Sequence, residues 1–220
     1  MAMNPHYWNK RYERQGRIYG RDPSELAKWA MRNGVLARDA RLLETGCGTG
    51  RNSIFFAKHG LDVTGVDFSP AALALAKEDS SNESVSVTWL KGDMTNLREL
   101  PQLQPGTFNA AFSNFCLHLF SCEERTHAVQ ELHRVLADDG VLIASLLSTS
   151  DADYGKGAKR AYNTFELEPG KPQHFFTRQE AEALFMAFRI GQLEEVREME
   201  AIVSSTCETA FWRLVARKRG

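Results

Sequence analysis

A seven-residue stretch of this chain combines an acidic side chain with three glycines at alternate positions. It runs from Glu44 to Gly50 as Glu-Thr-Gly-Cys-Gly-Thr-Gly, between an apolar run and a helix-like run. Glycine has no Cβ, so it adopts positive φ angles and lets a ligand approach the main chain, while the following helix offers free N–H groups. The stretch therefore predicts a ligand site at a strand-to-helix turn.

The spacing of the glycines disfavours a pyrophosphate ligand. A dinucleotide fingerprint needs G-x-G-x-x-G, and Arg51 stands where its last glycine would be. A phosphate-binding P-loop is disfavoured because no Gly-Lys-Ser/Thr follows. Glu44 would repel a phosphate and attract an ammonium or a sulfonium group. These residues favour a positively charged, nucleotide-like ligand, although a tight turn in another α/β protein would use the same glycines.

The stretch from Leu42 to Gly50 resembles the first motif of the class I S-adenosylmethionine-dependent methyltransferases, which has an acidic residue, one further residue and Gly-x-Gly-x-Gly. The resemblance implies methyl transfer with S-adenosyl-L-methionine as cofactor and S-adenosyl-L-homocysteine as product. It also implies that Glu44, Gly46, Cys47 and Gly48 contact the cofactor. No His or Asp is placed to activate Cys47 as a nucleophile.

The ends of later strands supply the remaining cofactor contacts. Asp67 follows the glycine turn by about 20 residues, where an acid accepts from both ribose hydroxyls, and Phe68 is placed to pack on the adenine. The resemblance implies that Asp93 accepts from the adenine amino group, that Met94 offers a backbone N–H and that Asn114 approaches the methionyl amino group. Taken singly, Asp67 is explained as a helix cap, Phe68 as a core residue and Asp93 as a turn former. Their order at successive strand ends favours a cofactor site.

The N-terminal segment carries a cluster of aromatic residues. Tyr7-Trp8-Asn9-Lys10-Arg11-Tyr12, followed by Ile18-Tyr19-Gly20, resembles the N-terminal lid of tellurite-resistance-type and related small-molecule methyltransferases. The resemblance implies that Trp8, Arg11 and Tyr19 close over the cofactor, with the planar guanidinium pairing with its carboxylate. The alternative is an amphipathic helix whose aromatic residues only pack on the sheet.

Alternating apolar and helix-like runs predict the fold class. We expect strands at residues 42–45, 62–67, 85–90, 108–114 and 141–147, and helices at residues 52–59, 70–78, 122–136 and 177–188. Two further strand-like runs, 193–202 and 209–218, have no helix between them and are expected to pair in antiparallel fashion. The pattern indicates an α/β, doubly wound, seven-stranded and mostly parallel sheet with one antiparallel strand from a C-terminal hairpin.

A chain of 220 residues that is 43% hydrophobic is expected to form a single domain around one core. We divide it into an N-terminal helical lid at residues 1–39, a cofactor-binding core at 40–147, a substrate-side insertion at 148–176, and a C-terminal helix and hairpin at 177–220. The lid and the insertion are expected over the carboxyl ends of the strands, where open α/β sheets bind ligands.

Composition and motifs argue against several partners. The formal net charge is −1 and no basic groove is indicated. Enzymes that methylate the exocyclic amines of nucleic-acid bases resemble one another in an Asn/Asp-Pro-Pro-Tyr/Phe motif, and the stretch Ser113-Asn114-Phe115-Cys116 lacks it. Both features disfavour nucleic acid as a partner. The four cysteines, at positions 47, 116, 122 and 207, are scattered and indicate free thiols rather than a zinc site or disulfides. Without a signal peptide or a run of about 20 apolar residues, we expect a cytoplasmic protein with no membrane partner. The oligomeric state stays open.

Methyl transfer from a sulfonium is an in-line displacement that needs little acid–base help, so we expect neither a metal nor a covalent intermediate. Candidate bases are His118, Tyr154 and His174, although a packing or hydrogen-bonding role is favoured for a histidine among apolar residues. The aromatic lid and the insertion predict an enclosed pocket for a small acceptor: a thiol, an amine, a carboxylate or a metalloid oxyanion. The alternatives are a non-catalytic sensor or scaffold that binds S-adenosylmethionine, and an NAD(P)-dependent oxidoreductase.

Overall fold

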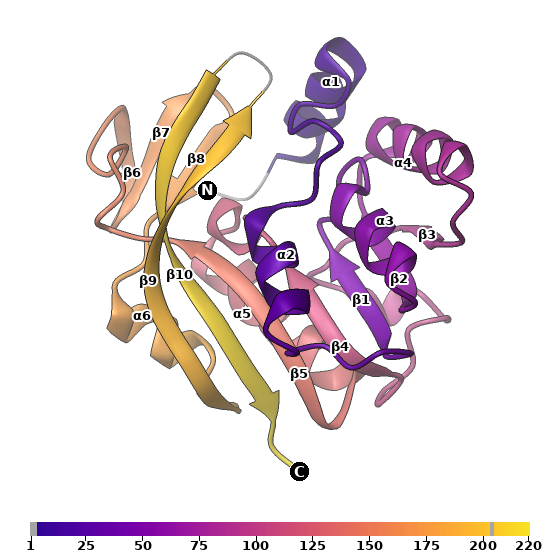
Figure 1. Cartoon of the computed structure of the whole chain (residues 1–220). Helices are drawn as coiled ribbons and strands as arrows, with labels where there is room; N and C mark the ends of the chain where they lie inside the picture. The colour runs from indigo at the N-terminus through magenta and orange to yellow at the C-terminus, as the bar shows by residue number, and fades with distance from the viewer. Residues whose placement is uncertain (1–3, 203–204) are drawn as a thin grey trace.

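A seven-stranded sheet forms the centre of the computed structural model, which describes residues 4–202 and 205–220 (Figure 1). In spatial order its strands are β3 (Thr88–Lys91), β2 (Asp62–Asp67), β1 (Arg41–Thr45), β4 (Phe108–Ser113), β5 (Leu136–Leu147), β10 (Ser205–Lys218) and β9 (Phe188–Ile202). Neighbouring strands from β3 to β5 pair in parallel, and β10 pairs antiparallel with both β5 and β9. This arrangement confirms the predicted fold class.

Two apolar layers cover the sheet because successive side chains on a strand point to opposite faces. On β1, Leu42 packs in the cluster that contains Phe56, whereas Leu43 packs in the cluster that contains Leu132. Helices α2 (Glu25–Arg32) and α3 (Arg51–Lys58) supply the first layer, and α5 (Cys122–Val135) and α6 (Arg178–Leu184) contribute to the second. The central strands β1 and β4 are therefore buried on both faces, as is usual in a parallel sheet.

The N-terminal segment divides into two parts with different positions. Helix α2 packs on the face of the sheet through Leu26, Ala27 and Ala30. Helix α1 (Pro5–Gln15) instead lies at one end of the molecule, between α4 (Pro70–Asn82) and the insertion (Figure 1). Within the described part of the segment expected to form a lid, residues 4–39, α1 and the loop that follows it reach the ends of the strands.

The insertion after β5 folds into a small antiparallel sheet, which the sequence analysis did not predict. Its strands are β6 (Ala158–Ala161), β7 (Thr164–Glu168) and β8 (Lys171–His174). The turn between β7 and β8 contains the dipeptide Pro169-Gly170, in which Gly170 has a φ of 85°. A Pro-Gly pair favours a tight turn and was the available signal for this hairpin.

Several boundaries differ from the prediction, most of all those of β5, α6 and β9. Strand β5 begins at Leu136, directly after α5, because Leu136 pairs with Phe108 and a bulge separates this pair from the pair of Ala110 with Val141. Helix α6 is shorter than expected and β9 begins at Phe188, whose side chain is buried and whose backbone pairs with Lys218. The local apolar pattern did not reveal these pairings.

Three cysteines in the described residues are free thiols: Cys47 and Cys116 are buried and Cys122 is exposed. The side chain of Cys207 lies outside the described part. None of the helices within residues 4–202 and 205–220 has both the length and the apolar content to cross a membrane.

Candidate functional site

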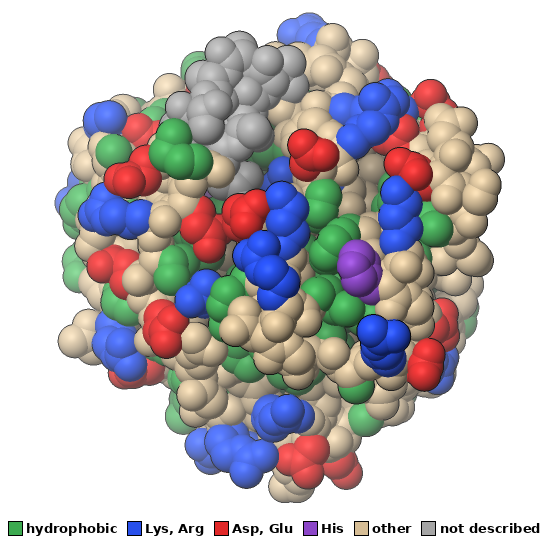
Figure 2. All heavy atoms as spheres, in the orientation of Figure 1, with side chains coloured by type: hydrophobic (Ala, Val, Ile, Leu, Met, Phe, Trp, Pro, Cys, Tyr) green, Lys and Arg blue, Asp and Glu red, His purple; other side chains and the backbone are tan. Residues whose placement is uncertain are grey.

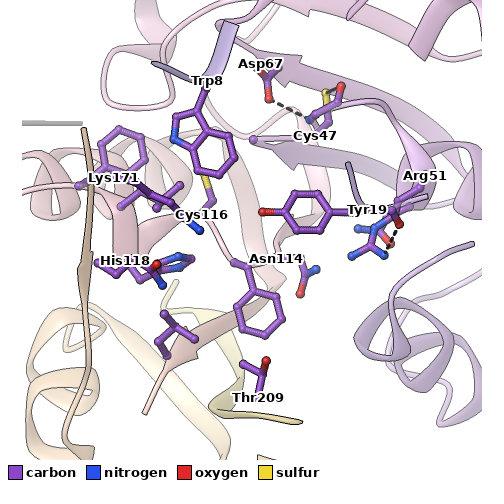
Figure 3. A pocket seen from close by; sticks show the side chains of 18 of the residues that line it. Trp8, Tyr19, Cys47, Arg51, Asp67, Asn114, Cys116, His118, Lys171 and Thr209 are labelled. Carbon is purple, nitrogen blue, oxygen red and sulfur yellow. Dashed lines mark hydrogen bonds between the residues drawn. The ribbon is translucent and has the colours of Figure 1, made fainter. Parts of the chain in front are cut away.

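A cavity of ≈ 500 Å³ lies at the carboxyl ends of the parallel strands (Figure 3). Its wall combines α1 and the following loop, the glycine turn after β1, the ends of β2 and β4, the 3₁₀ helix η2 (Leu117–Leu119), the insertion and the start of β10. The predicted site residues that line it are Trp8, Tyr19, Glu44, Gly46, Cys47, Gly48, Asp67, Phe68, Asn114 and His118. Its volume is in the usual range of small-molecule sites.

The glycine turn requires its glycines. Gly46 and Gly48 have φ angles of 66° and 54°, which are costly for residues with a Cβ. A Cβ on Gly46 would lie 2.4 Å from Sγ of Cys116, and a Cβ on Gly48 would lie 2.7 Å from the hydroxyl of Tyr12. The turn therefore presents bare backbone to the cavity, as the sequence predicted.

Glu44 is buried under this turn with a relative exposure of 2%. Asn52 Nδ2 donates to its Oε1 at 3.0 Å, and the Ser53 hydroxyl donates to its Oε2. Burial raises the pKa of Glu44 to about 7, and the two hydrogen bonds oppose this shift. The carboxyl group thus joins the end of β1 to the first turn of α3 and titrates near neutral pH.

Asp67 holds the next part of the site together. Its carboxylate accepts from the backbone N–H groups of Gly48 and Ser69, each at 2.8 Å. Burial raises its pKa to about 6, while the two backbone hydrogen bonds favour the ionised form. The N–H of Gly92 donates to the Asp67 carbonyl at 3.1 Å, so the turn that contains Asp93 begins beside Asp67.

Helix α1 places two aromatic side chains on the cavity. Trp8 and Tyr12 line it and are 6% and 8% exposed. The sequence analysis missed Tyr12, although it follows Trp8 by four residues and therefore shares its helix face. Burial, and to a smaller extent the charge of Asp67, raise the pKa of Tyr12 well above its usual value. The neutral phenol thus lies directly over the glycine turn.

Three predicted cofactor residues do not line the cavity. Arg11 Nη1 donates to the Tyr7 hydroxyl at 2.8 Å and lies 3.5 Å from the Glu168 carboxylate, so this side chain braces α1 against β7. Asp93 is exposed and accepts from the N–H and the hydroxyl of Thr95. Met94 is buried behind the wall, where it contacts Cys116.

Two of the three candidate bases also lie outside the cavity wall. Tyr154 donates from its hydroxyl to Asn163 at 2.8 Å, and His174 lies 3.4 Å from the carboxylate of Glu180. Burial lowers the pKa of His174 to about 4. Both side chains support the insertion, and His118 is the candidate that the structure brings to the cavity.

Asn114, His118, Lys171 and Thr209 line another part of the cavity wall (Figure 3). The Ser145 hydroxyl donates to Oδ1 of Asn114 at 2.9 Å, which orients the amide at the end of β4. Lys171 enters from β8, and its Nζ lies 5.7 Å from the centre of the Trp8 ring. The sequence analysis missed Lys171 and Thr209 because neither belongs to a motif and each reaches the site only through tertiary structure.

The described residues, 4–202 and 205–220, contain no cluster of three or more His, Cys, Asp or Glu side chains arranged to hold a metal ion.

Comparison with known proteins gives one family match, to a family described as a methyltransferase domain, over residues 42–140. A putative methyltransferase of Geobacillus sp. (strain WCH70) is 30% identical over 124 residues, which are 52% of this chain and 45% of that protein. The chain spans about half the length of the curated relatives that it matches.

Several solved structures share the architecture. The 1,6-didemethyltoxoflavin-N1-methyltransferase of Burkholderia thailandensis, solved with S-adenosylhomocysteine, is 20% identical with a TM-score of 0.69 and covers 100% of this chain and 92% of that chain. TehB of Haemophilus influenzae is 17% identical with a TM-score of 0.66, and the match covers 97% of this chain and 66% of that chain. A structure from work on thioacetal formation in echinomycin biosynthesis is 18% identical with a TM-score of 0.80, over 98% of this chain and 93% of that chain. At these identities the likeness shows a common fold.

Proposed function

We propose that this chain is a class I S-adenosylmethionine-dependent methyltransferase that transfers a methyl group from S-adenosylmethionine to a small-molecule acceptor. The observation that carries this proposal is the position of Asp67 beside the bare backbone of Gly48, at the wall of one cavity. When bound, the cofactor would supply a methyl group on a positively charged sulfur.

The residues of the site suit such a cofactor. Each oxygen of Asp67 accepts one backbone N–H, and a carboxylate has further lone pairs for two ribose hydroxyls. We assign the adenine to the space between Phe68 and the turn of Asp93 and Met94. The methionyl end is assigned to the glycine turn and Asn114. Arg11 is engaged with Tyr7 and Glu168, so we give it a structural role in place of the predicted pairing with the cofactor.

The volume of the cavity, its aromatic lining and the distribution of charge support a small acceptor. Trp8, Phe115 and Phe120 line the cavity. On the face shown in Figure 2, basic and acidic side chains are interspersed rather than gathered by sign, in keeping with the formal net charge of −1. Binding to nucleic acid relies on a concentrated basic surface, so these features favour a small molecule.

The assignment of Asp67 is testable by calorimetry with S-adenosylhomocysteine. We expect one site per chain and an affinity that falls by about tenfold or more in Asp67→Ala, since a charged hydrogen bond to ribose is lost. Asp62→Ala is the matched control, because Asp62 is exposed and lies at the opposite end of the same strand, β2. Equal affinities in the two variants would refute the ribose assignment.

A turnover assay separates the enzyme from the alternative sensor or scaffold. Purified protein is incubated with S-adenosylmethionine and a panel of small thiols, amines, carboxylates and oxyanions, and the release of S-adenosylhomocysteine is measured. Turnover with one class of acceptor supports the proposal. Tight cofactor binding without turnover on the whole panel would favour the sensor, and binding of NADH in place of the adenosyl ligand would favour an oxidoreductase.

A further inference from the structure

His118 is a buried polar group without a partner at the cavity. It lines the cavity, is 6% exposed, and its Nδ1 has no hydrogen-bond partner among the residues that the structure describes. An unpaired polar atom in such a position has lost its hydration without gaining a hydrogen bond in return, which destabilises the empty site. A ligand that supplies the missing hydrogen bond would remove part of this destabilisation, so His118 indicates where a ligand polar atom lies.

The surroundings of His118 are positively charged. Figure 3 shows the ammonium group of Lys171 and the imidazole ring pointing toward each other. Burial, and to a smaller extent the charges of Lys171, His174 and Arg125, lower the pKa of His118 to about 3. The ring is therefore neutral at physiological pH, and the space beside it favours an anion over a cation.

The acidic residues on the cavity wall are engaged with other groups. Asp151 accepts from the backbone N–H of Ala210 at 2.7 Å, and Asp153 pairs with Lys156 at 3.1 Å. Glu208 pairs with Arg197 at 3.1 Å. Asp153 and Glu208 are thus paired with cations, and the charged neighbours that act on the His118 ring are Lys171, His174 and Arg125, so the field at the ring is positive.

Aromatic side chains lie beside His118 and Lys171. The ring of Phe115 lies 6.2 Å from the His118 ring at 78° and 5.0 Å from the Phe211 ring at 73°. Phe115 has a φ of 47°, a left-handed conformation that is rare for a bulky residue, and its N–H donates to the Ser145 hydroxyl at 2.7 Å. The Phe115 backbone thus holds the ring in one position at a cost in conformational strain. A ring fixed in this way offers a surface on which a flat ligand can stack.

We propose that the methyl acceptor is a small aromatic oxyanion, either a carboxylate or an ionised hydroxyl on a flat ring. Its charged oxygen lies between Lys171 and His118, and its ring packs against Phe115. The proposal rests on the proposed methyl transfer and narrows its acceptor class to an O-nucleophile.

The reaction balances without a catalytic base. A lone pair of the acceptor oxygen forms the new oxygen–carbon bond while the carbon–sulfur bond breaks and its electron pair stays on sulfur. The negative charge of the acceptor and the positive charge of the sulfonium disappear together, and the products are a neutral ester or ether and a thioether. Neutral His118 donates one N–H to the oxygen, and no proton changes place because the acceptor enters ionised.

The test uses the full chain saturated with S-adenosylhomocysteine, so that acceptor binding is measured without turnover. Benzoate and 4-nitrophenol are the two oxyanion probes, with benzamide and nitrobenzene as their neutral counterparts. We expect each anion to bind at least about tenfold more tightly than its counterpart, and the visible absorbance of 4-nitrophenolate to appear at a pH where the free phenol is mostly protonated. The preference between the two anions identifies the kind of oxygen.

Variants assign the effect to residues. Lys171→Met should weaken both anions about tenfold and remove the phenolate absorbance, whereas Lys159→Met, at an exposed lysine of β6, should change neither. His118→Asn keeps a donor near Nδ1 and should stay within about threefold of the wild type, whereas His118→Phe should lose about tenfold.

Several results would overturn the inference while S-adenosylhomocysteine still binds normally. These are equal binding of benzamide and benzoate, unchanged anion affinity in Lys171→Met, and binding of selenite in preference to either aromatic anion. Loss of S-adenosylhomocysteine binding by the wild-type chain would instead refute the proposed function itself.

Discussion

At the scale of single residues, desolvation shifts the titration of every buried ionisable group at the cavity. Burial is the largest cause that raises the pKa of Glu44 and Asp67 and the largest that lowers the pKa of His118. All three groups are thereby moved toward their neutral forms. The site is thus prepared for a ligand whose own charge replaces lost hydration, such as a sulfonium beside the acids and an anion beside the histidine.

The raised pKa of Glu44 predicts a specific pH dependence of stability. Between pH 4.5 and about 7 the folded state binds more protons at Glu44 than the unfolded chain does, so the free energy of unfolding falls as pH rises through this range. Relative to Glu44→Gln, which stays neutral, the wild type should lose stability over that window in urea denaturation.

For Asp67, the free energy of unfolding of the wild type relative to Asp67→Asn should fall over a lower range, from pH 3.8 to about 6.

For Glu44, a difference in the free energy of unfolding between the wild type and Glu44→Gln that stays constant from pH 4 to 8 would contradict the account of that buried carboxyl group.

The left-handed backbone of Phe115 leads to a second prediction. Both Phe115→Ala and Phe115→Gly remove the ring, but only glycine relieves the positive φ, so Phe115→Gly should be more stable than Phe115→Ala by roughly 0.5–1 kcal/mol. Phe120, with a φ of −94°, provides the matched control. There glycine should be the less stable of the two substitutions, and the same order at both positions would argue against strain at Phe115.

At the scale of elements, α1 connects two parts of the chain that are distant in sequence. Asn9 Oδ1 accepts from the Ser69 hydroxyl at 2.8 Å and from the Ala71 N–H at 3.2 Å, which attaches α1 to the start of α4. On the other side the Tyr7 hydroxyl donates to Glu168 of β7 at 2.6 Å. These contacts hold the aromatic face of α1 over the cavity.

Asn9→Ala should therefore loosen α1 without affecting the sheet. We expect faster amide hydrogen exchange in residues 5–15 and a higher rate of S-adenosylhomocysteine release, with unchanged exchange in β1 and β4. Asn33→Ala is a control of the same type, since Asn33 hydrogen-bonds only to the end of α2, through the Trp29 carbonyl at 2.9 Å. Equal exchange of α1 in both variants would show that Asn9 does not hold the helix.

At the scale of the whole molecule, local patterns predicted the parts of the fold that local physics decides. Strand β2 matches its predicted bounds because the β-branched Val63, Thr64 and Val66 lie between Asp62 and Asp67, and the glycine turn has the positive φ angles that its residues indicated. Strand β6 was missed because all four of its residues are exposed, so it carries no apolar alternation. Its pairing depends on β7 and on the turn at Asn163, whose φ is 49°.

The same distinction applies to the site. The residues that follow strand ends, such as Asp67 and Asn114, were identified because parallel topology brings strand ends together. Lys171 reaches the cavity because the insertion folds back over the sheet. Arg11 instead contacts Glu168, which lies 157 residues later in the chain. Such contacts depend on tertiary structure and leave no pattern in the local sequence.

The most direct test of the central claim is a crystal structure of the full chain with S-adenosylhomocysteine. The account predicts both ribose hydroxyls within hydrogen-bond distance of the Asp67 carboxylate, the methionyl end along Gly46 and Gly48, and the thioether sulfur facing the space beside His118 and Lys171. A structure in which Tyr12 still covers Gly48 and the ligand lies outside this cavity would contradict it.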